Sequence, residues 1–148
     1  MPIRPYQASD REGCLALLRS NIPEHFSPAE EAELARFLDA LPGPYFVLEQ
    51  DGRIVASGGI AAERDGLTAT LCWGLVQADR QRGGLGTRLL AHRLAAFLAE
   101  RPEIRRIQVN TSQKVQAFYA RHGFAVLEVR PRAYGPDLDH VRMLRDLP

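Results

Sequence analysis

Apolar residues recur every three or four positions in four stretches of the chain, which is the spacing of an amphipathic helix. The longest stretch begins at Leu85 and is closed by Pro102, and its apolar positions hold five leucines and Phe97. Charged and polar residues fill the positions between them, so that the side chains of His92 and Arg93 are expected on the opposite face. This pattern predicts the longest helix of the protein.

Two shorter helices are predicted near the beginning of the chain, over about 10–21 and 28–41. Each is preceded by the pattern of a capping box, in which a serine side chain accepts a hydrogen bond from the first turn and a glutamate three positions later reaches back. The two pairs are Ser9 with Glu12 and Ser27 with Glu30. A fourth, short helix is predicted to carry Phe118 and Tyr119.

Runs rich in β-branched and aromatic residues predict the strands. Residues 45–49 and 54–60 are joined through Asp51-Gly52, a dipeptide that suits a tight hairpin. After a second turn at Asp65-Gly66, residues 68–76 extend this pair to a three-stranded meander. Further strands are predicted over 104–110, 125–129 and 140–144. The complete order of elements is βααβββαβαββ, an α/β (α+β) arrangement.

Length and composition indicate one globular domain spanning 1–148, because 45% of the residues are hydrophobic and 25% are charged. The formal net charge is only +1, without the basic excess typical of proteins that bind nucleic acid or membrane surfaces. A small molecule or a peptide is therefore the expected partner. Neither a membrane-spanning run nor the apolar core of a signal peptide is found, which predicts a cytoplasmic protein.

The cysteines and histidines show no metal-binding pattern. Cys14 and Cys72 lie far apart in apolar stretches and are interpreted as core thiols. His92, His122 and His140 share no ligand spacing. No metal is therefore predicted.

The glycine-rich segment 81–87, Gln-Arg-Gly-Gly-Leu-Gly-Thr, joins the third strand of the meander to the long helix. Glycines let the backbone approach a ligand closely, and the unpaired N–H groups at a helix N-terminus attract an anion. The segment therefore predicts a phosphate or pyrophosphate site. It lacks the third glycine of the dinucleotide fingerprint and the lysine of a P-loop, so that both of those nucleotide-binding patterns fit poorly.

Residues Gln81, Gly84 and Gly86 fit the pattern Gln/Arg-x-x-Gly-x-Gly/Ala, and the segments after the long helix add to this match. A strand ends at Asn110, and it is followed at regular intervals by Asn110-Thr111-Ser112, Ala117-Phe118-Tyr119 and Gly123-Phe124. With this succession of motifs, the sequence resembles the GNAT superfamily of N-acetyltransferases along essentially its whole length. The resemblance implies a mixed, mainly antiparallel central sheet with helices on both faces.

The resemblance also implies how acetyl-CoA, the co-substrate, would bind. The strand ending near Val76 would splay from the strand ending near Asn110, and the pantetheine arm would lie between them. Backbone amides of the glycine-rich turn would hold the pyrophosphate. The residues implied in cofactor binding are Leu75, Val76, Gln81, Arg82, Gly83, Gly84, Leu85, Gly86, Thr87, Asn110, Ser112, Ala117 and Phe118.

By the same resemblance, Tyr119 would be catalytic and would donate a hydrogen bond to the departing CoA sulfur. The group that removes a proton from the amine stays unassigned, because strand 71–76 lacks the glutamate that several relatives have there. The alternatives left open for this base are Glu63, Asp65 and His25. Regions that commonly border the acceptor site in the superfamily contain the implied substrate-binding residues His25, Phe26 and Tyr134.

The expected function is that of an N-acetyltransferase, which passes the acetyl group of acetyl-CoA to a primary amine of a small molecule, peptide or protein by direct attack in a ternary complex. The alternative is a non-catalytic module that binds acyl-CoA as a sensor or scaffold. The sequence leaves open the acceptor amine, the acyl-chain preference and the oligomeric state, a homodimer included.

Overall fold

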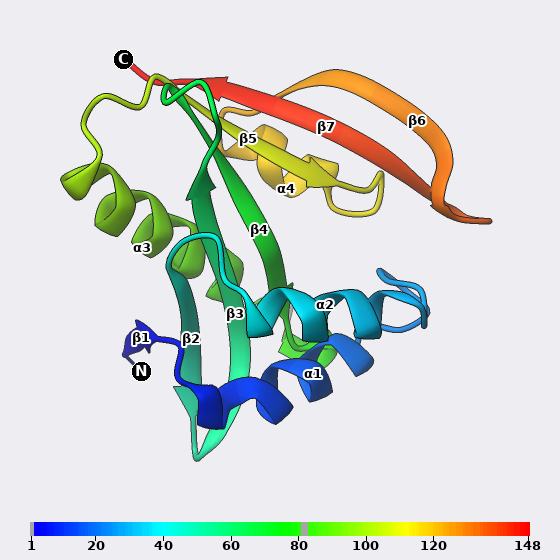
Figure 1. Cartoon of the computed structure of the whole chain (residues 1–148). Coiled ribbons are helices and arrows are strands. Elements are labelled where there is room, and N and C mark those ends of the chain that lie inside the picture. Colours follow the sequence, from blue (N-terminus) through cyan, green and yellow to red (C-terminus); the bar gives the residue numbers. More distant parts are fainter. Residues whose placement is uncertain (1, 81–82) are drawn as a thin grey trace.

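A seven-stranded sheet lies at the centre of the protein, and helices pack on both of its faces (Figure 1). The computed structural model describes residues 2–80 and 83–148. Within these residues the strands are β1 (Ile3–Pro5), β2 (Tyr45–Gln50), β3 (Arg53–Ala62), β4 (Thr68–Val76), β5 (Arg106–Thr111), β6 (Ala125–Gly135) and β7 (Leu138–Asp146). The α-helices are α1 (Arg11–Arg19), α2 (Glu30–Asp39), α3 (Leu85–Glu100) and α4 (Gln116–Arg121), and single 3₁₀ turns are η1 (Ala8–Asp10) and η2 (Ala78–Arg80). The predicted order βααβββαβαββ is confirmed.

The strands follow the order β1-β2-β3-β4-β5-β7-β6 across the sheet, and all neighbours are antiparallel except β4 and β5. This confirms the mixed, mainly antiparallel sheet. β6 is longer than predicted, because it stays paired with β7 as far as the tip, where Gly135 pairs with Leu138. Most of its side chains are exposed, so that no alternation of buried and exposed residues marks its second half in the sequence.

Successive side chains of β2 point to opposite faces of the sheet and therefore pack into two different cores. Tyr45 and Val47 pack with α1 and α2, whereas Phe46 and Leu48 pack beneath the start of α3. A third core joins α3 and α4 to β4, β5 and β7. Figure 1 accordingly shows α1 and α2 together on one face and α3 on the other. Among the helices of the described residues, none has the length and apolar character to cross a membrane.

The start of α1 differs from the predicted capping box. Instead of Ser9 and Glu12, Asp10 closes the first turn, and its Oδ2 accepts a hydrogen bond from the Gln7 N–H at 2.8 Å. Arg4 reaches across from β1 and binds both carboxylate oxygens of Asp10, at 2.8 and 2.9 Å. A contact between residues of different elements therefore selects the cap, and local spacing alone does not show it.

The predicted pair at the start of α2 is formed in part. Glu30 Oε1 accepts hydrogen bonds from the Ser27 N–H and hydroxyl, each at 3.4 Å. The helix begins at Glu30, two residues later than predicted, and Pro28 lies in the turn before it. The glutamate half of the capping box is thus present.

Replacing Asp10 with asparagine is expected to lower the free energy of unfolding by about 1–3 kcal/mol at pH 7, because Arg4 loses a charged partner. The hydrogen bonds from Arg4 hold the pKa of Asp10 below its ordinary value. The carboxylate therefore stabilises the fold above the unfolded-state pKa of about 3.9, and this contribution is lost as the pH falls through the lower folded-state pKa. Denaturant titrations at neutral and at acidic pH should show the difference between wild type and variant shrinking in acid.

The control for this change is Asp39→Asn, which removes the exposed ion pair with Arg11. Exposed pairs of this kind contribute less than about 1 kcal/mol. Equal losses from the two variants would contradict the structural role assigned to Asp10.

Candidate active site

β4 and β5 lie side by side at one end and separate at the other. Their parallel pairing covers only residues 68–71 of β4 and 106–109 of β5. Beyond it, β4 continues along β3 through residues 72–76, and β5 continues along β7 through residues 110–111. The sheet therefore opens between the ends of the two strands (Figure 1), as the resemblance implied. We call this opening the gap.

A β-bulge alters the direction of β4 beside the gap. The register between β3 and β4 shifts between Ser57 and Gly59, and Trp73 has a φ of +46°, in the left-handed region that a tryptophan rarely adopts. Tyr45 stabilises this backbone from the α1 side, because its hydroxyl donates a hydrogen bond to the Trp73 carbonyl at 3.0 Å. The bulge thus changes the direction of β4 where its pairing with β5 ends.

The glycine-rich turn leads into α3. Gly84 is the N-cap residue of this helix and has a φ of +78°, which glycine adopts without strain. Its carbonyl accepts a hydrogen bond from the Arg88 N–H at 3.1 Å. The first N–H groups of a helix have no partner within it, so that the start of α3 offers the backbone donors that an anion site requires. Gln81 and Arg82, also predicted to bind the cofactor, lie outside the described residues.

Gly86 allows α3 and α4 to approach each other closely. A Cβ at this position would lie 3.3 Å from two ring atoms of Phe118 and 3.8 Å from a methyl group of Val76. The predicted cofactor residues Val76, Gly86 and Phe118 are distant in sequence, and the fold brings them together at the end of β4. Gly86 therefore has a packing role in addition to the predicted backbone role.

Tyr119 reaches β4 beside the gap. Its side chain is 7% exposed, and a Cβ built on Gly74 would lie 3.4 Å from its hydroxyl oxygen. Its ring packs edge to face with Phe118 and Phe124, at 5.1 and 5.5 Å between ring centroids. The aromatic contacts fix the ring and leave the hydroxyl against the bulged part of β4. The hydrogen bond to a leaving sulfur stays a prediction.

The expectation that Arg93 lies on the outer face of the long helix is wrong. Its side chain is 2% exposed and extends toward the bulge, where Nη1 donates a hydrogen bond to the Gly59 carbonyl at 3.2 Å. The guanidinium fits because Gly58 and Gly74 carry no side chain on that face. Arg93 lies four residues after Leu89 and four before Phe97, so that helical spacing places it on the buried face, and only its charge argued for the outer one. The available signal was two glycine positions on neighbouring strands.

The loop between α1 and α2 packs on the other face of the bulge. Phe26 stacks on Trp73 with the ring centroids 6.2 Å apart, and Phe37 of α2 lies 6.3 Å from the same ring. His25 precedes Phe26 in this loop, and its N–H donates to the Asn21 carbonyl at 2.8 Å. The predicted acceptor residues of this loop thus lie on the sheet face opposite to Tyr119.

Tyr134, near the tip of the β6–β7 hairpin, extends toward α2. Burial, together with the nearby carboxylates of Glu30 and Glu33, raises the pKa of its phenol to about 12. Its ring also packs on His140, with the centroids 5.1 Å apart. The third predicted acceptor residue therefore lies beside the acidic first turn of α2.

Two residues before α4 link these segments. Lys114 Nζ donates to the Glu24 carbonyl of the α1–α2 loop at 2.7 Å. Gln113 Nε2 donates to the Asp137 carbonyl at 2.9 Å, and its Oε1 accepts from the Asp139 N–H at 2.8 Å. The loop, the hairpin tip and the segment after β5 therefore form one connected border, which we call the acceptor rim after the predicted acceptor residues in it.

Comparison with known families agrees with this geometry. The sequence matches the family described as acetyltransferase (GNAT) domain over residues 8–147, which is nearly the whole chain. The chain belongs to the GNAT acetyltransferase family. No curated protein sequence matches this acetyltransferase significantly.

Solved structures share the fold of this GNAT acetyltransferase. An aminoglycoside 6'-N-acetyltransferase complexed with coenzyme A has a TM-score of 0.79 at 18% identity, covering 100% of this chain and 98% of that one. The ribosomal-protein-S18-alanine N-acetyltransferase from Escherichia coli has a TM-score of 0.78 at 22% identity, covering 98% and 92%. Ard1 from Thermoplasma volcanium has a TM-score of 0.81 at 17% identity, covering 99% and 97%. At these identities the likeness concerns the fold alone.

Three polar residues predicted to contact the cofactor of the acetyltransferase have partners within the protein. The contacts are Asn110 Oδ1 to His140 Nε2 at 2.8 Å, Thr87 Oγ1 to His122 Nε2 at 3.2 Å, and Ser112 Oγ, which accepts from the Lys114 N–H at 3.3 Å. Ser112 is buried and begins the turn into α4. These side chains therefore order the loops around the gap.

Two leucines among the predicted cofactor residues are core residues. Leu75 packs with α1 and α2, and Leu85, the first residue of α3, packs against β2 and β3. A ligand can therefore meet them mainly through their backbone. Gly83 and Ala117 are exposed, at the turn and at the start of α4. The Val76 carbonyl is held by Asn21 Nδ2, which donates to it at 3.0 Å.

Two of the residues considered as the base, Glu63 and Asp65, lie at the end of β4 that is far from the gap. Asp65 accepts hydrogen bonds from the Leu67 and Thr68 N–H groups at 2.9 Å and shapes the turn before β4. Glu63 accepts from the Thr70 hydroxyl at 3.0 Å. Both carboxylates stand where β4 is still paired with β5, away from the gap. The hydrogen bonds at the turn before β4 account for the placement of both carboxylates.

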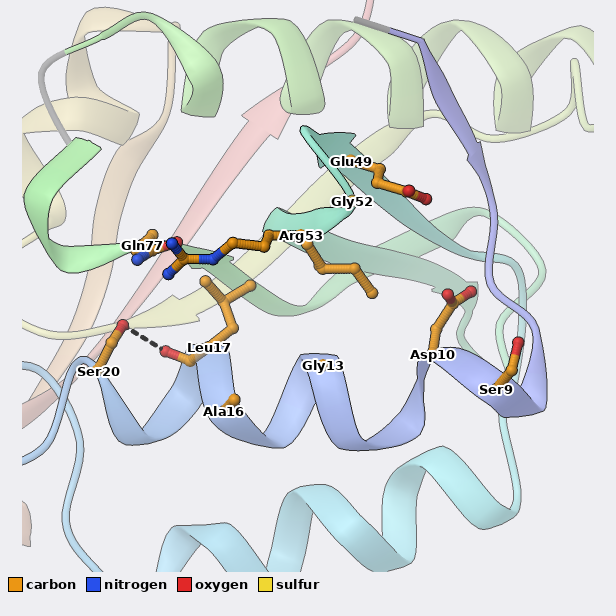
Figure 2. Close-up of a pocket in the computed structure, with 11 residues that line it drawn as sticks. Ser9, Asp10, Gly13, Ala16, Leu17, Ser20, Glu49, Gly52, Arg53 and Gln77 are labelled. Atoms are coloured by element: carbon orange, nitrogen blue, oxygen red, sulfur yellow. Dashed lines mark hydrogen bonds between the residues drawn. The ribbon is translucent and has the colours of Figure 1, made fainter.

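A cavity of about 420 Å³ lies between α1 and the β2–β3 hairpin (Figure 2). Its lining includes Asp10, Gly13 and Leu17 from the α1 side and Glu49 and Arg53 from the hairpin. None of the cofactor or acceptor residues predicted within the described part of the chain lines it. The cavity is therefore separate from the gap.

Proposed function

We propose that this chain is an N-acetyltransferase that passes the acetyl group of acetyl-CoA to a primary amine of a small molecule, peptide or protein. The observation that supports this best is the gap between β4 and β5, with the turn at Gly84 at its open end and the Tyr119 hydroxyl beside it. The membership in the GNAT acetyltransferase family supports acetyl transfer as the reaction.

The α3 side of the gap suits acetyl-CoA. The first N–H groups of α3 would bind the pyrophosphate, since the helix N-terminus favours negative charge. Residues 72–76 of β4 extend past the β5 pairing and would line the pantetheine arm. Tyr119 would donate its hydrogen bond to the sulfur as the thioester breaks.

The acceptor rim suits an amine that is cationic in solution. Glu30 and Glu33 lie beside Tyr134 there, and burial raises the pKa of the Glu30 carboxyl. An alkyl amine with a pKa of about 10.4 must lose its proton before attack, which costs about 4.6 kcal/mol at pH 7. The aromatic stack of Phe26 and Trp73 would reduce hydration of the amine and so lower its pKa. The amine would then attack the thioester directly in a ternary complex.

A thiol-release assay with a panel of amines tests this function. The panel holds polyamines, amino acids, aminoglycosides and peptides with free N-termini or lysines, each with acetyl-CoA and with longer acyl-CoAs. Release of CoA that depends on one class of amine, with the acetylated product identified by mass spectrometry, is the expected result. Tight binding of acyl-CoA without release in any reaction would favour the sensor or scaffold function instead.

Replacing Tyr134 with alanine is expected to raise the KM for the amine about tenfold, while the Kd for acetyl-CoA changes less than about twofold. The reason is that Tyr134 lies on the acceptor rim beside α2, away from the glycine-rich turn. His25→Ala should act in the same direction. Steady-state kinetics with the best amine and calorimetry with acetyl-CoA measure the two quantities.

The control is Val129→Ala on β6, whose side chain is 46% exposed and lies outside the rim. It should leave both quantities unchanged. A loss of acetyl-CoA affinity in Tyr134→Ala with an unaltered KM for the amine would contradict the acceptor role of Tyr134 and would indicate a contact with acetyl-CoA instead.

A further inference from the structure

The Arg93 guanidinium is a buried positive charge. It forms no ion pair among the described residues, and its Nε is buried without a hydrogen-bond partner there. Its Nη1 has the Gly59 carbonyl as its partner. Burying a charge without a counter-charge is costly, and a buried donor without a partner needs an explanation, of which an anion met in function is one. The surroundings of Arg93 show where that anion would be.

The sheet leaves space for this side chain at two glycines. A Cβ on Gly58 would lie 2.9 Å from Nη1 and 3.0 Å from Cζ of Arg93, closer than real side chains pack. A Cβ on Gly74 would lie 3.2 Å from Nη2. Gly58 is on β3 and Gly74 on β4, both at the bulge. The guanidinium is therefore held against the part of β4 that borders the gap.

Tyr119 approaches β4 at the same residue, Gly74, as Arg93 does. The Cβ position of Gly74 that lies 3.2 Å from Arg93 Nη2 lies 3.4 Å from the Tyr119 hydroxyl oxygen. Arg93 lies in the electrostatic surroundings of Cys72 of β4 and Tyr45 of β2, and the Glu63 carboxylate also acts on Cys72. Glu63 accepts a hydrogen bond from the Thr70 hydroxyl and forms no ion pair with Arg93. The guanidinium and the phenol thus border one small region of the gap.

We infer that Arg93 supplies a fixed positive charge that stabilises the negative charge developing on the CoA sulfur, next to the hydrogen bond from Tyr119. The inference rests on the acetyltransferase function proposed above. As the amine nitrogen bonds to the thioester carbon, the carbon–sulfur bond breaks and its electron pair leaves on sulfur. The nitrogen loses one proton and the sulfur finally gains one, while Arg93 stays protonated throughout. A preorganised charge at a developing anion is an effective way to lower a barrier.

The bound product, CoA with its free thiol, gives a test that needs no acceptor. The thiol of enzyme-bound CoA is titrated by the ultraviolet absorbance of its thiolate, with CoA-free enzyme as the reference. Burial raises the pKa of both Cys14 and Cys72 to about 11, above the range of an ordinary thiol near 8.5, so that the CoA signal is separate. In the wild type, we expect the pKa of the bound thiol to be at least one unit below that of free CoA.

Three variants separate charge from packing. Arg93→Met keeps the length of the side chain without its charge and should raise the pKa of the bound thiol by one unit or more. Arg93→Lys keeps the charge and should retain at least half of the shift. Arg101→Met removes a charge from the far end of the same helix and should change nothing. Single-turnover acetyl transfer should slow at least tenfold in Arg93→Met.

Each outcome has a separate meaning. If wild-type enzyme binds neither CoA nor acetyl-CoA, the proposed function fails. If CoA binds and its thiol titrates as it does free in solution, the inference about Arg93 is overturned while the function stands, and this result needs no variant. An identical thiol pKa in wild type and folded Arg93→Met would also overturn it and would leave Arg93 as a support of the bulge.

Discussion

Replacing Tyr119 with phenylalanine is expected to slow single-turnover acetyl transfer by about ten- to a thousandfold, while the affinity for acetyl-CoA changes little. Phenylalanine keeps the ring contacts with Phe118 and Phe124 and removes only the hydroxyl that lies against Gly74. The hydrogen bond to sulfur strengthens as charge develops, so that its loss affects the transition state more than the bound ground state. The variant should fold normally.

The measurement uses rapid mixing with saturating acetyl-CoA and amine, because slow product release can hide an effect on the chemical step. Tyr6→Phe is the matched control, since Tyr6 packs on Tyr45 with ring centroids 5.7 Å apart, on the α1 side of the sheet. Wild-type speed in Tyr119→Phe under these conditions would eliminate Tyr119 as the donor to sulfur. A general loss of folded protein would be visible by circular dichroism.

The second large effect is expected at the turn: Gly84→Val should weaken acetyl-CoA binding by about ten- to a hundredfold, or about 1.4–2.8 kcal/mol. Apart from its chain neighbours, no atom of the described residues lies within 4 Å of a Cβ at Gly84, so that the added side chain would stand in front of the α3 N-terminus. That space is where a pyrophosphate would approach the backbone N–H groups. Isothermal calorimetry with acetyl-CoA measures the change.

A matched control exists because valine is also strained by the positive φ of +78° at Gly84. Gly66, in the turn between β3 and β4, has a φ of +70°, and beyond its chain neighbours its Cβ position likewise has no atom of the described part of the chain within 4 Å. Gly66→Val should therefore lose similar stability and bind acetyl-CoA as the wild type does. If the two variants bind acetyl-CoA equally well, the turn is not the pyrophosphate site.

The two variants and the Arg93 titration examine three successive parts of one gap. The turn at Gly84 concerns binding, Tyr119 concerns the breaking of the thioester, and Arg93 concerns the charge on sulfur. Their readouts differ, being a Kd, a single-turnover rate and a thiol pKa. A failure in one therefore does not by itself decide the others.

The sequence alone determined the order of the elements, because each has its own local cause. β4 was predicted with both ends correct, since the turn at Asp65-Gly66 precedes it and polar residues follow Val76. The start of α3 follows a glycine that takes the left-handed conformation a helix cap here requires. Periodicity and turn chemistry act over a few residues, and they remain readable without knowing what the segment packs against.

Only the tertiary structure decided what each element meets. The gap arises because β5 leaves β4 to pair with β7, and the Asp10 cap of α1 is selected by Arg4 from another strand. Arg93 is buried because glycines on two other strands leave space for its guanidinium, although its charge favours the surface. Burial depends on the shape of neighbouring elements, and that shape forms only when residues distant in sequence come together.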